Sequence, residues 1–237
     1  MLLLPEVNQR RRVPEIMDEP GLDVRRHFAA LRGLARINAW SGSIRILWQP
    51  IRDLAQKKGE ALRVLDIATG AGDIPVRLWQ RAQRAGICLT MAACDCSPHA
   101  LEYARQRATQ AKAPVRFFEW DAFENSLPAD YDVVMSSLFL HHLDENQAVQ
   151  LLRRMAQAAT HLVLVNDLVR SPAGFLLAYF GTRLLTTSGV VHTDGPRSVE
   201  AAFTVEEIRL LAERAGLAGT RVDRRWPCRM LLTWERR

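Results

Sequence analysis

The chain has 237 residues, of which 48% are hydrophobic and 24% are charged, a balance that excludes disordered and fibrous proteins. This length allows one α/β domain with a substantial core, together with a modest extension or insertion. No stretch reaches the ~18 uncharged apolar residues that a membrane span needs, and the N-terminus lacks the pattern of a secretory signal. We therefore expect a cytoplasmic protein without a membrane span.

The net charge of +6 comes from the two ends of the chain. Residues 1–58 carry eleven Lys/Arg against six Asp/Glu, and residues 219–237 carry six against two. Such termini suit an anionic substrate, RNA or a membrane surface, or they are simply solvated charge. The four cysteines have no histidine-rich segment beside them, so we expect reduced thiols and no metal site.

The predicted elements begin with two helices, over residues 23–40 and 44–57, in an N-terminal helical extension that spans residues 1–58. From residue 59 to 237, β-rich runs alternate with amphipathic runs, which indicates a doubly wound, mostly parallel sheet. The predicted strands cover residues 62–68, 88–95, 115–121, 131–138 and 161–168, and an antiparallel hairpin follows at 220–226 and 230–234. The predicted helices between them cover residues 74–85, 98–112, 144–158 and 204–216.

An insertion at residues 169–203 separates the fifth strand from the last helix, where a connection usually has 2–6 residues. Ser171-Pro172 begins a helix with an apolar stripe, and residues 189–198 are predicted to form a loop. Long connections at the carboxyl ends of strands usually serve binding, so we expect a substrate cap. The alternative is that the stripe merely covers the sheet.

The strongest chemical signal is V-L-D-I-A-T-G-A-G-D-I-P at residues 64–75. A buried strand carries Asp66, and a Gly70-Ala71-Gly72 turn and a helix follow. Glycines allow positive φ and a close approach of the backbone to a ligand, and the helix N-terminus favours a carboxylate. Asp66 and Asp73 add negative charge where a cationic group would bind. The segment therefore suits a ligand that carries both a carboxylate and an ammonium.

Two further carboxylates end the next two predicted strands. Asp95 follows the second strand, where it would accept hydrogen bonds from both hydroxyls of a ribose. Asp121 follows the third strand, where it would accept from an adenine amino group. Carboxyl ends of parallel strands share one edge of a sheet, so these carboxylates and Asp66 would border one site.

This pattern resembles the class I S-adenosylmethionine (SAM)-dependent methyltransferases over about residues 60–237. The segment YDVVMSSLFLHHL at residues 131–143 is similar to the fourth-strand motif of small-molecule methyltransferases related to ubiquinone and menaquinone biosynthesis. The resemblance implies a Rossmann-like sheet of seven strands that binds SAM and releases S-adenosyl-L-homocysteine (SAH). It also implies a cofactor site lined by Asp66, Ala68, Gly70, Gly72, Asp95, Cys96, Asp121, Ala122 and Ser137.

The activity that the resemblance implies is methyl transfer to oxygen or carbon of a small aromatic, quinone-like or polyketide-like acceptor, as in secondary metabolism. Candidates for the general base are His142, His192 and Asp167. Candidates for acceptor binding are Arg36, Asn38, His141, Tyr179 and Phe180. Each has a structural alternative: helix capping for Asp167, packing for one of the adjacent histidines, and exposure to solvent for His192.

Three other functions compete with this one. A nicotinamide-dependent dehydrogenase would need G-x-G-x-x-G, but Pro75 stands at the third glycine position. Methylation of RNA or another nucleic acid stays open because the termini are basic, although residues 136–139 read S-S-L-F rather than an Asn-Pro-Pro-Tyr type of motif. A SAM-binding protein without catalytic activity is the third possibility.

Overall fold

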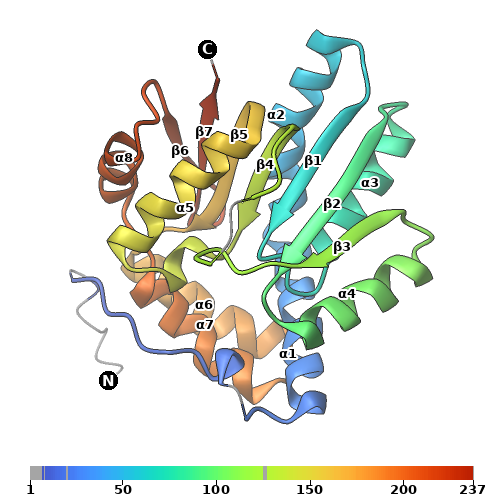
Figure 1. Ribbon diagram of the computed structural model, residues 1–237. Coiled ribbons are helices and arrows are strands. Elements are labelled where there is room, and N and C mark those ends of the chain that lie inside the picture. Colours follow the sequence, from blue (N-terminus) through green and yellow to red (C-terminus); the bar gives the residue numbers. More distant parts are fainter. Residues whose placement is uncertain (1–6, 8, 20, 125–126, 237) are drawn as a thin grey trace.

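The computed structural model describes residues 7, 9–19, 21–124 and 127–236, which form a seven-stranded sheet in the order β3-β2-β1-β4-β5-β7-β6 (Figure 1). Strands β1 to β5 run parallel, and β7 pairs antiparallel with both β5 and β6. The strands are β1 Leu62–Ile67, β2 Leu89–Asp95, β3 Val115–Glu119, β4 Tyr131–Ser137, β5 Ala159–Leu168, β6 Arg221–Arg225 and β7 Arg229–Glu235. This confirms the predicted doubly wound, Rossmann-like sheet and its C-terminal hairpin.

Helices cover both faces of the sheet. Side chains of α2 and α3 pack on one face, and those of α5 and α8 pack on the other. The helices are α1 Val24–Trp40, α2 Ser43–Lys58, α3 Asp73–Arg84, α4 Pro98–Gln110, α5 Glu145–Ala158, α6 Pro172–Leu185, α7 Gly189–Ala201 and α8 Val205–Arg214, with short 3-10 turns η1 Ile16–Asp18 and η2 Leu140–His142. No helix in this described part of the chain is long and apolar enough to cross a membrane.

The helix starts follow the capping residues of the sequence. The Ser97 hydroxyl accepts the amide of Ala100 at the start of α4. Asp144 and Thr204 each form a complete capping box, at α5 and α8 respectively. A side-chain acceptor at this position satisfies amides that the helix leaves unpaired, which fixes the boundary from local sequence alone.

The predicted loop at residues 189–198 is wrong, because this segment belongs to α7. The segment contains two glycines, Thr193 and Pro196, and all of these disfavour a helix interior. Packing reverses that preference: Val190 and Val191 are buried against Ala30 of α1. The backbone amides of Ile16 and Met17 also donate to the Asp194 carboxylate, at 3.0 and 3.1 Å. Contacts distant in sequence therefore stabilise a helix that local propensity opposes.

Helices α1, α6 and α7 gather at one end of the sheet, beyond the carboxyl ends of the parallel strands (Figure 1). The N-terminal segment joins them, since Arg10 Nε donates to the carbonyl of Ala201, at the end of α7, and the amide of Arg11 donates to that of Glu200. The N-terminal segment and helices α1, α6 and α7 thus meet over the edge of the sheet where the predicted site residues lie.

Candidate active site

A cavity of about 610 Å³ lies between the carboxyl ends of the strands and helices α1, α6 and α7. Most of the residues predicted from the sequence line it: Asp66, Ala68, Gly70, Asp95, Cys96, Asp121, Ala122, Ser137, Asn38, His141 and His142. The structure therefore brings together residues from both halves of the prediction, those expected near the cofactor and those expected near the acceptor.

Asp66 is the most deeply buried carboxylate of the cavity wall, with 1% of its surface exposed. The Thr69 hydroxyl donates to its Oδ2 at 2.7 Å, whereas its Oδ1 has no hydrogen-bond partner among the described residues. Burial raises the pKa of Asp66 to about 8 against the opposing hydrogen bond from Thr69. A buried acceptor without a donor is costly, so this oxygen fits a cationic N–H donor, such as an ammonium, that enters the cavity.

Asp95 links the glycine turn to the end of β2. Its Oδ2 accepts the amide of Gly70 at 2.8 Å, and its Oδ1 accepts the amide of Ser97 at 2.9 Å. Burial raises the pKa of Asp95, while these two backbone hydrogen bonds lower it. Each carboxylate oxygen can accept a second hydrogen bond, so the side chain is fixed in place and still able to accept from two hydroxyls.

Asp121 and its neighbours form the far end of the same wall. The structure ends β3 at Glu119, two residues before the predicted end, so Asp121 lies in the turn that follows. Its Oδ1 accepts the amide of Phe123 at 2.6 Å. Trp120 and Ala122 line the cavity on either side of it, and the Trp120 Nε1–H has no partner among the described residues. An apolar slot beside a carboxylate suits a flat ring with an amino group.

Gly72 does not line the cavity, although the resemblance places it at the cofactor. It has a φ of 64°, and a Cβ built on it would lie 2.7 Å from the Cβ of Ala104 in α4. Its role in the structure is to let α3 and α4 approach each other closely.

We expect Gly72→Ala to lower the free energy of unfolding by at least ~1–2 kcal/mol, because a left-handed non-glycine residue costs that much before the clash is counted. Urea unfolding followed by circular dichroism measures this. Gly189→Ala is the matched control, since nothing lies within 4 Å of its added Cβ. An unchanged urea midpoint for Gly72→Ala would show that the close packing is not required.

His141 lines the cavity from η2, shortly after the end of β4. Its Nδ1 is 2.6 Å from Asp167 Oδ1, and its backbone amide donates to Asp167 Oδ2 at 3.2 Å. Burial alone would lower the pKa of His141, but the carboxylates of Asp167 and Glu15 outweigh it and raise the pKa to about 10. Asp167, at the end of β5, does not line the cavity itself, so its carboxylate acts on the cavity through His141.

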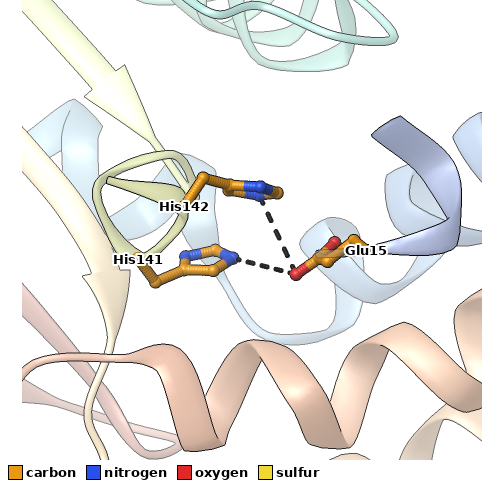
Figure 2. A group of neighbouring side chains, drawn as sticks. All are labelled: Glu15, His141 and His142. Carbon is orange, nitrogen blue, oxygen red and sulfur yellow. Dashed lines mark ion pairs between the residues drawn. The ribbon is translucent and has the colours of Figure 1, made fainter. Parts of the chain in front are cut away.

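Glu15 completes this group from the N-terminal segment, as Figure 2 shows. Its Oε1 is 3.6 Å from His141 Nε2 and 3.9 Å from His142 Nε2. His142 Nδ1 is 3.0 Å from the Asp18 carboxylate, so each histidine has one carboxylate on Nδ1 and faces Glu15 with Nε2. The three facing atoms lie within 4.8 Å of one another, a spacing that could also hold a metal ion, although the sequence predicts no metal site.

Besides Gly72 and Asp167, four predicted residues lie outside the cavity lining. His192 Nε2 is 2.7 Å from the carbonyl of Thr186, within the cap at residues 169–203. Phe180 is 52% exposed, and Tyr179 contacts its ring edge-to-face and has the Arg183 guanidinium over its own ring. Helix α6 faces the cavity with other residues instead, namely Gly174, Leu177, Ala178, Gly181, Thr182 and Leu185. Arg36 is also outside the lining, and its Nη1 donates to the carbonyl of Leu185.

Sequence reasoning missed four charged residues of the cavity wall, Glu15, Asp18, Glu19 and Arg229, of which Glu15 and Arg229 are the most buried. Glu15 lies 126 positions before His141, and no local pattern connects the two. Arg229 begins β7 and is only 2% exposed. The available signal was an arginine directly before the apolar run Met230-Leu231-Leu232 of a predicted strand. An arginine in such a place is unusual, because buried arginines need partners.

Comparisons with known proteins agree with this geometry. Residues 64–161 match the family model described as a methyltransferase domain. Demethylmenaquinone methyltransferase of Deinococcus radiodurans is 34% identical over 105 residues, which are 44% of this chain and 42% of that protein. The same enzyme of Thermus thermophilus is 29% identical over 177 residues, 70% of this chain and 78% of that protein.

Among solved structures, a candidate O-methyltransferase from Nostoc punctiforme superposes with a TM-score of 0.65 at 20% sequence identity. The superposition covers 97% of this chain and 65% of that one, so this chain lacks a counterpart to about a third of that structure. The matched family segment contains Asp66, the glycine turn, Asp95, Asp121, His141 and His142. Residues 64–161 therefore match a methyltransferase domain, and the chain as a whole shares the fold of the compared O-methyltransferase structure.

Proposed function

We propose that this protein transfers the methyl group of SAM to an oxygen or carbon of a small aromatic, quinone-like or polyketide-like acceptor. The observation that carries the proposal is the continuity of the cavity: the carboxylates of Asp66 and Asp95 and the imidazole of His141, which Asp167 holds from behind, border one space of about 610 Å³. The volume of the cavity, and the helices α1, α6 and α7 that cover it, suit a small molecule bound beside the cofactor.

The strand ends provide the cofactor half of the proposal. The unpartnered Oδ1 of Asp66 would accept the ammonium of SAM, and Asp95 would accept the two ribose hydroxyls. Asp121 would accept from the adenine amino group, with Trp120 and Ala122 against the ring. When bound, SAM would supply a methyl group on a sulfonium, a leaving group that needs no protonation.

The acceptor half is lined by helices. Leu31 and Leu34 of α1, Leu177 and Leu185 of α6, and Phe139 after β4 provide an apolar wall. We propose that the extension at residues 1–58 and the cap at residues 169–203 together enclose the acceptor and exclude water. Holding an acceptor in line with the methyl group is the largest contribution that such an enclosure can make to the rate.

His141 would control the proton of an acceptor hydroxyl. At neutral pH its raised pKa keeps the imidazole protonated beside Asp167. The reactive state of His141 and the acceptor together has one proton fewer than the imidazolium with a neutral phenol. It is either a neutral imidazole next to a phenol or an imidazolium next to a phenolate. A phenol has a pKa of ~10, close to that of His141, so the proton can pass between the two at little cost in free energy. His142 lines the same wall but is more exposed, with Asp18 on its Nδ1.

The test is to incubate the purified chain with SAM and a panel of phenols and hydroxyquinones, and to measure both SAH and the methylated product. We expect Asp95→Ala to weaken SAH binding roughly tenfold to a hundredfold, because two hydroxyls lose an acceptor worth about 1.5–3 kcal/mol. Calorimetry measures the affinity, and circular dichroism checks the fold. An unchanged SAH affinity would place the ribose elsewhere.

A further inference from the structure

Arg229 presents a buried positive charge to the cavity. The residue begins β7, pairs in the sheet with Leu168 at the end of β5, and lines the cavity. Its Nη2 donates to the Ser41 hydroxyl at 2.5 Å and lies 3.5 Å from Asn38 Oδ1, so α1 holds one edge of the guanidinium. Its Nη1 is buried and has no hydrogen-bond partner among the described residues.

No carboxylate in the described part of the chain lies within ion-pair distance of Arg229. Burial lowers the pKa of Arg229 to about 10, and the more distant charges of Asp167 and Asp73 oppose that effect. The guanidinium therefore stays charged at neutral pH. A charge buried without an ion-pair partner is unfavourable, so the folded protein carries an electrostatic penalty at this position.

A second buried arginine of the same chain shows what a structural role requires. Arg170 is 7% exposed, and its guanidinium donates to both carboxylate oxygens of Glu207, at 2.7 and 3.0 Å. Its remaining donors reach the carbonyls of Val7 and Ala202. Arg170 is thus neutralised and satisfied by the protein, whereas Arg229 is not. The difference indicates that the partner of Arg229 comes from outside the chain.

We propose that Arg229 binds an anionic oxygen group, a carboxylate or a phenolate, of a ligand in the cavity. Two ligands could bring that group: SAM through the carboxylate of its amino-acid end, or an acceptor that is itself an acid. Asn38 contacts both Arg229 and Asp73 at the start of α3, so the guanidinium lies between the glycine turn and the acceptor wall. The inference deepens the proposed function and rests on it only for the identity of the ligand.

The first experiment needs no cofactor. Sodium benzoate, with benzamide as its neutral match, is titrated into the protein while the melting temperature is measured. If the cavity cation binds acids, benzoate stabilises the wild type, benzamide does not, and Arg229→Met abolishes the difference. Without any ligand, Arg229→Met should melt at or above the wild-type temperature, because it removes an unpaired charge, whereas Arg170→Met should melt lower. Arg229→Gln, which removes the charge but keeps a polar side chain, takes its place with the same expected loss of benzoate binding if the methionine variant does not fold.

The second experiment distinguishes the two sources. A loss of SAH affinity of roughly tenfold to a hundredfold in Arg229→Met, with no loss for decarboxylated SAH, assigns the site to the cofactor carboxylate. The site at Arg229 is assigned to the acceptor if SAH affinity is unchanged in Arg229→Met, and if benzoate binding persists at saturating SAH and requires Arg229. If neither ligand depends on Arg229, the inference is overturned. Failure of the wild type to bind SAH would instead contradict the proposed function and leave the benzoate result standing.

Discussion

His141→Ala is expected to lower the turnover number of methyl transfer to a phenolic acceptor by ~10²–10⁴-fold, the usual contribution of a group that controls a proton in the reaction. The affinity for SAH should change little, because His141 is held by Asp167 at the end of β5, whereas Asp66 and Asp95 lie on β1 and β2, on the other side of β4. Single-turnover measurements with saturating SAM isolate this step. His161→Ala, on the outer part of β5, is the matched control for replacing a histidine.

The pH dependence gives the same residue a second, independent test. The pKa of His141 is raised to about 10, so the reactive state, which has lost one proton, becomes more populated as pH rises from 7 towards 10. We expect the logarithm of turnover to increase over this range in the wild type, and His141→Ala to be slower throughout and to follow only the ionisation of the free phenol. Asp167→Asn should shift the profile to lower pH, since it removes the charge that raises the pKa. Full turnover in His141→Ala but not in His192→Ala would transfer the role to His192.

Asp66→Asn is expected to weaken SAH binding by about 10²–10³-fold or more, because the ligand ammonium would be buried without its carboxylate, a loss of the order of 3–5 kcal/mol. We expect so large a loss of SAH affinity because Asp66 is buried and because its Oδ1 lacks any other partner among the described residues. Asp223→Asn, exposed on β6, is the control. Calorimetric titration with SAH measures both variants.

Binding to Asp66 should also release a proton. Without ligand its pKa is about 8, so at pH 7 the carboxyl is mostly protonated. A bound ammonium favours the charged carboxylate and lowers that pKa, so the proton leaves as the ligand binds. SAH affinity should therefore increase as pH rises to about 8 and then level off. Titrations at pH 7 in phosphate and in Tris should give different enthalpies for the wild type and equal ones for Asp66→Asn. Equal enthalpies for the wild type would mean that Asp66 is not the ammonium partner.

The cofactor side of the site could be predicted from sequence because its geometry is local to each strand. Asp66, Asp95 and Asp121 lie at or just beyond the carboxyl ends of β1, β2 and β3, and a parallel sheet brings those ends to one edge. The acceptor side could not be predicted in the same way. Glu15 reaches His141 because the N-terminal segment packs on α7, and that helix was itself predicted to be a loop. Contacts of that range leave no periodicity in the sequence.

Helical phase explains the remaining differences. The apolar stripe of α6 is present, but its cavity face consists of Leu177, Ala178, Gly181 and Leu185, so Tyr179 and Phe180 lie on other sides of the helix. Which face of an apolar helix meets a ligand depends on the neighbouring helices, here α1 and α7. The role of Arg229 likewise depends on what surrounds it, since its burial follows from Ser41 and Asn38 of α1.

The central claim, that Asp66, the glycine turn and Asp95 form a SAM site, is tested most directly by thermal unfolding with SAH and with NAD. At a hundredfold excess over its dissociation constant, SAH should stabilise the wild type by ≈2.7 kcal/mol, which corresponds to a rise in melting temperature of about 5–10 °C for a chain of this size. NAD should give no rise, and Asp95→Ala should need a higher SAH concentration for the same effect. A rise with NAD and none with saturating SAH would contradict the account.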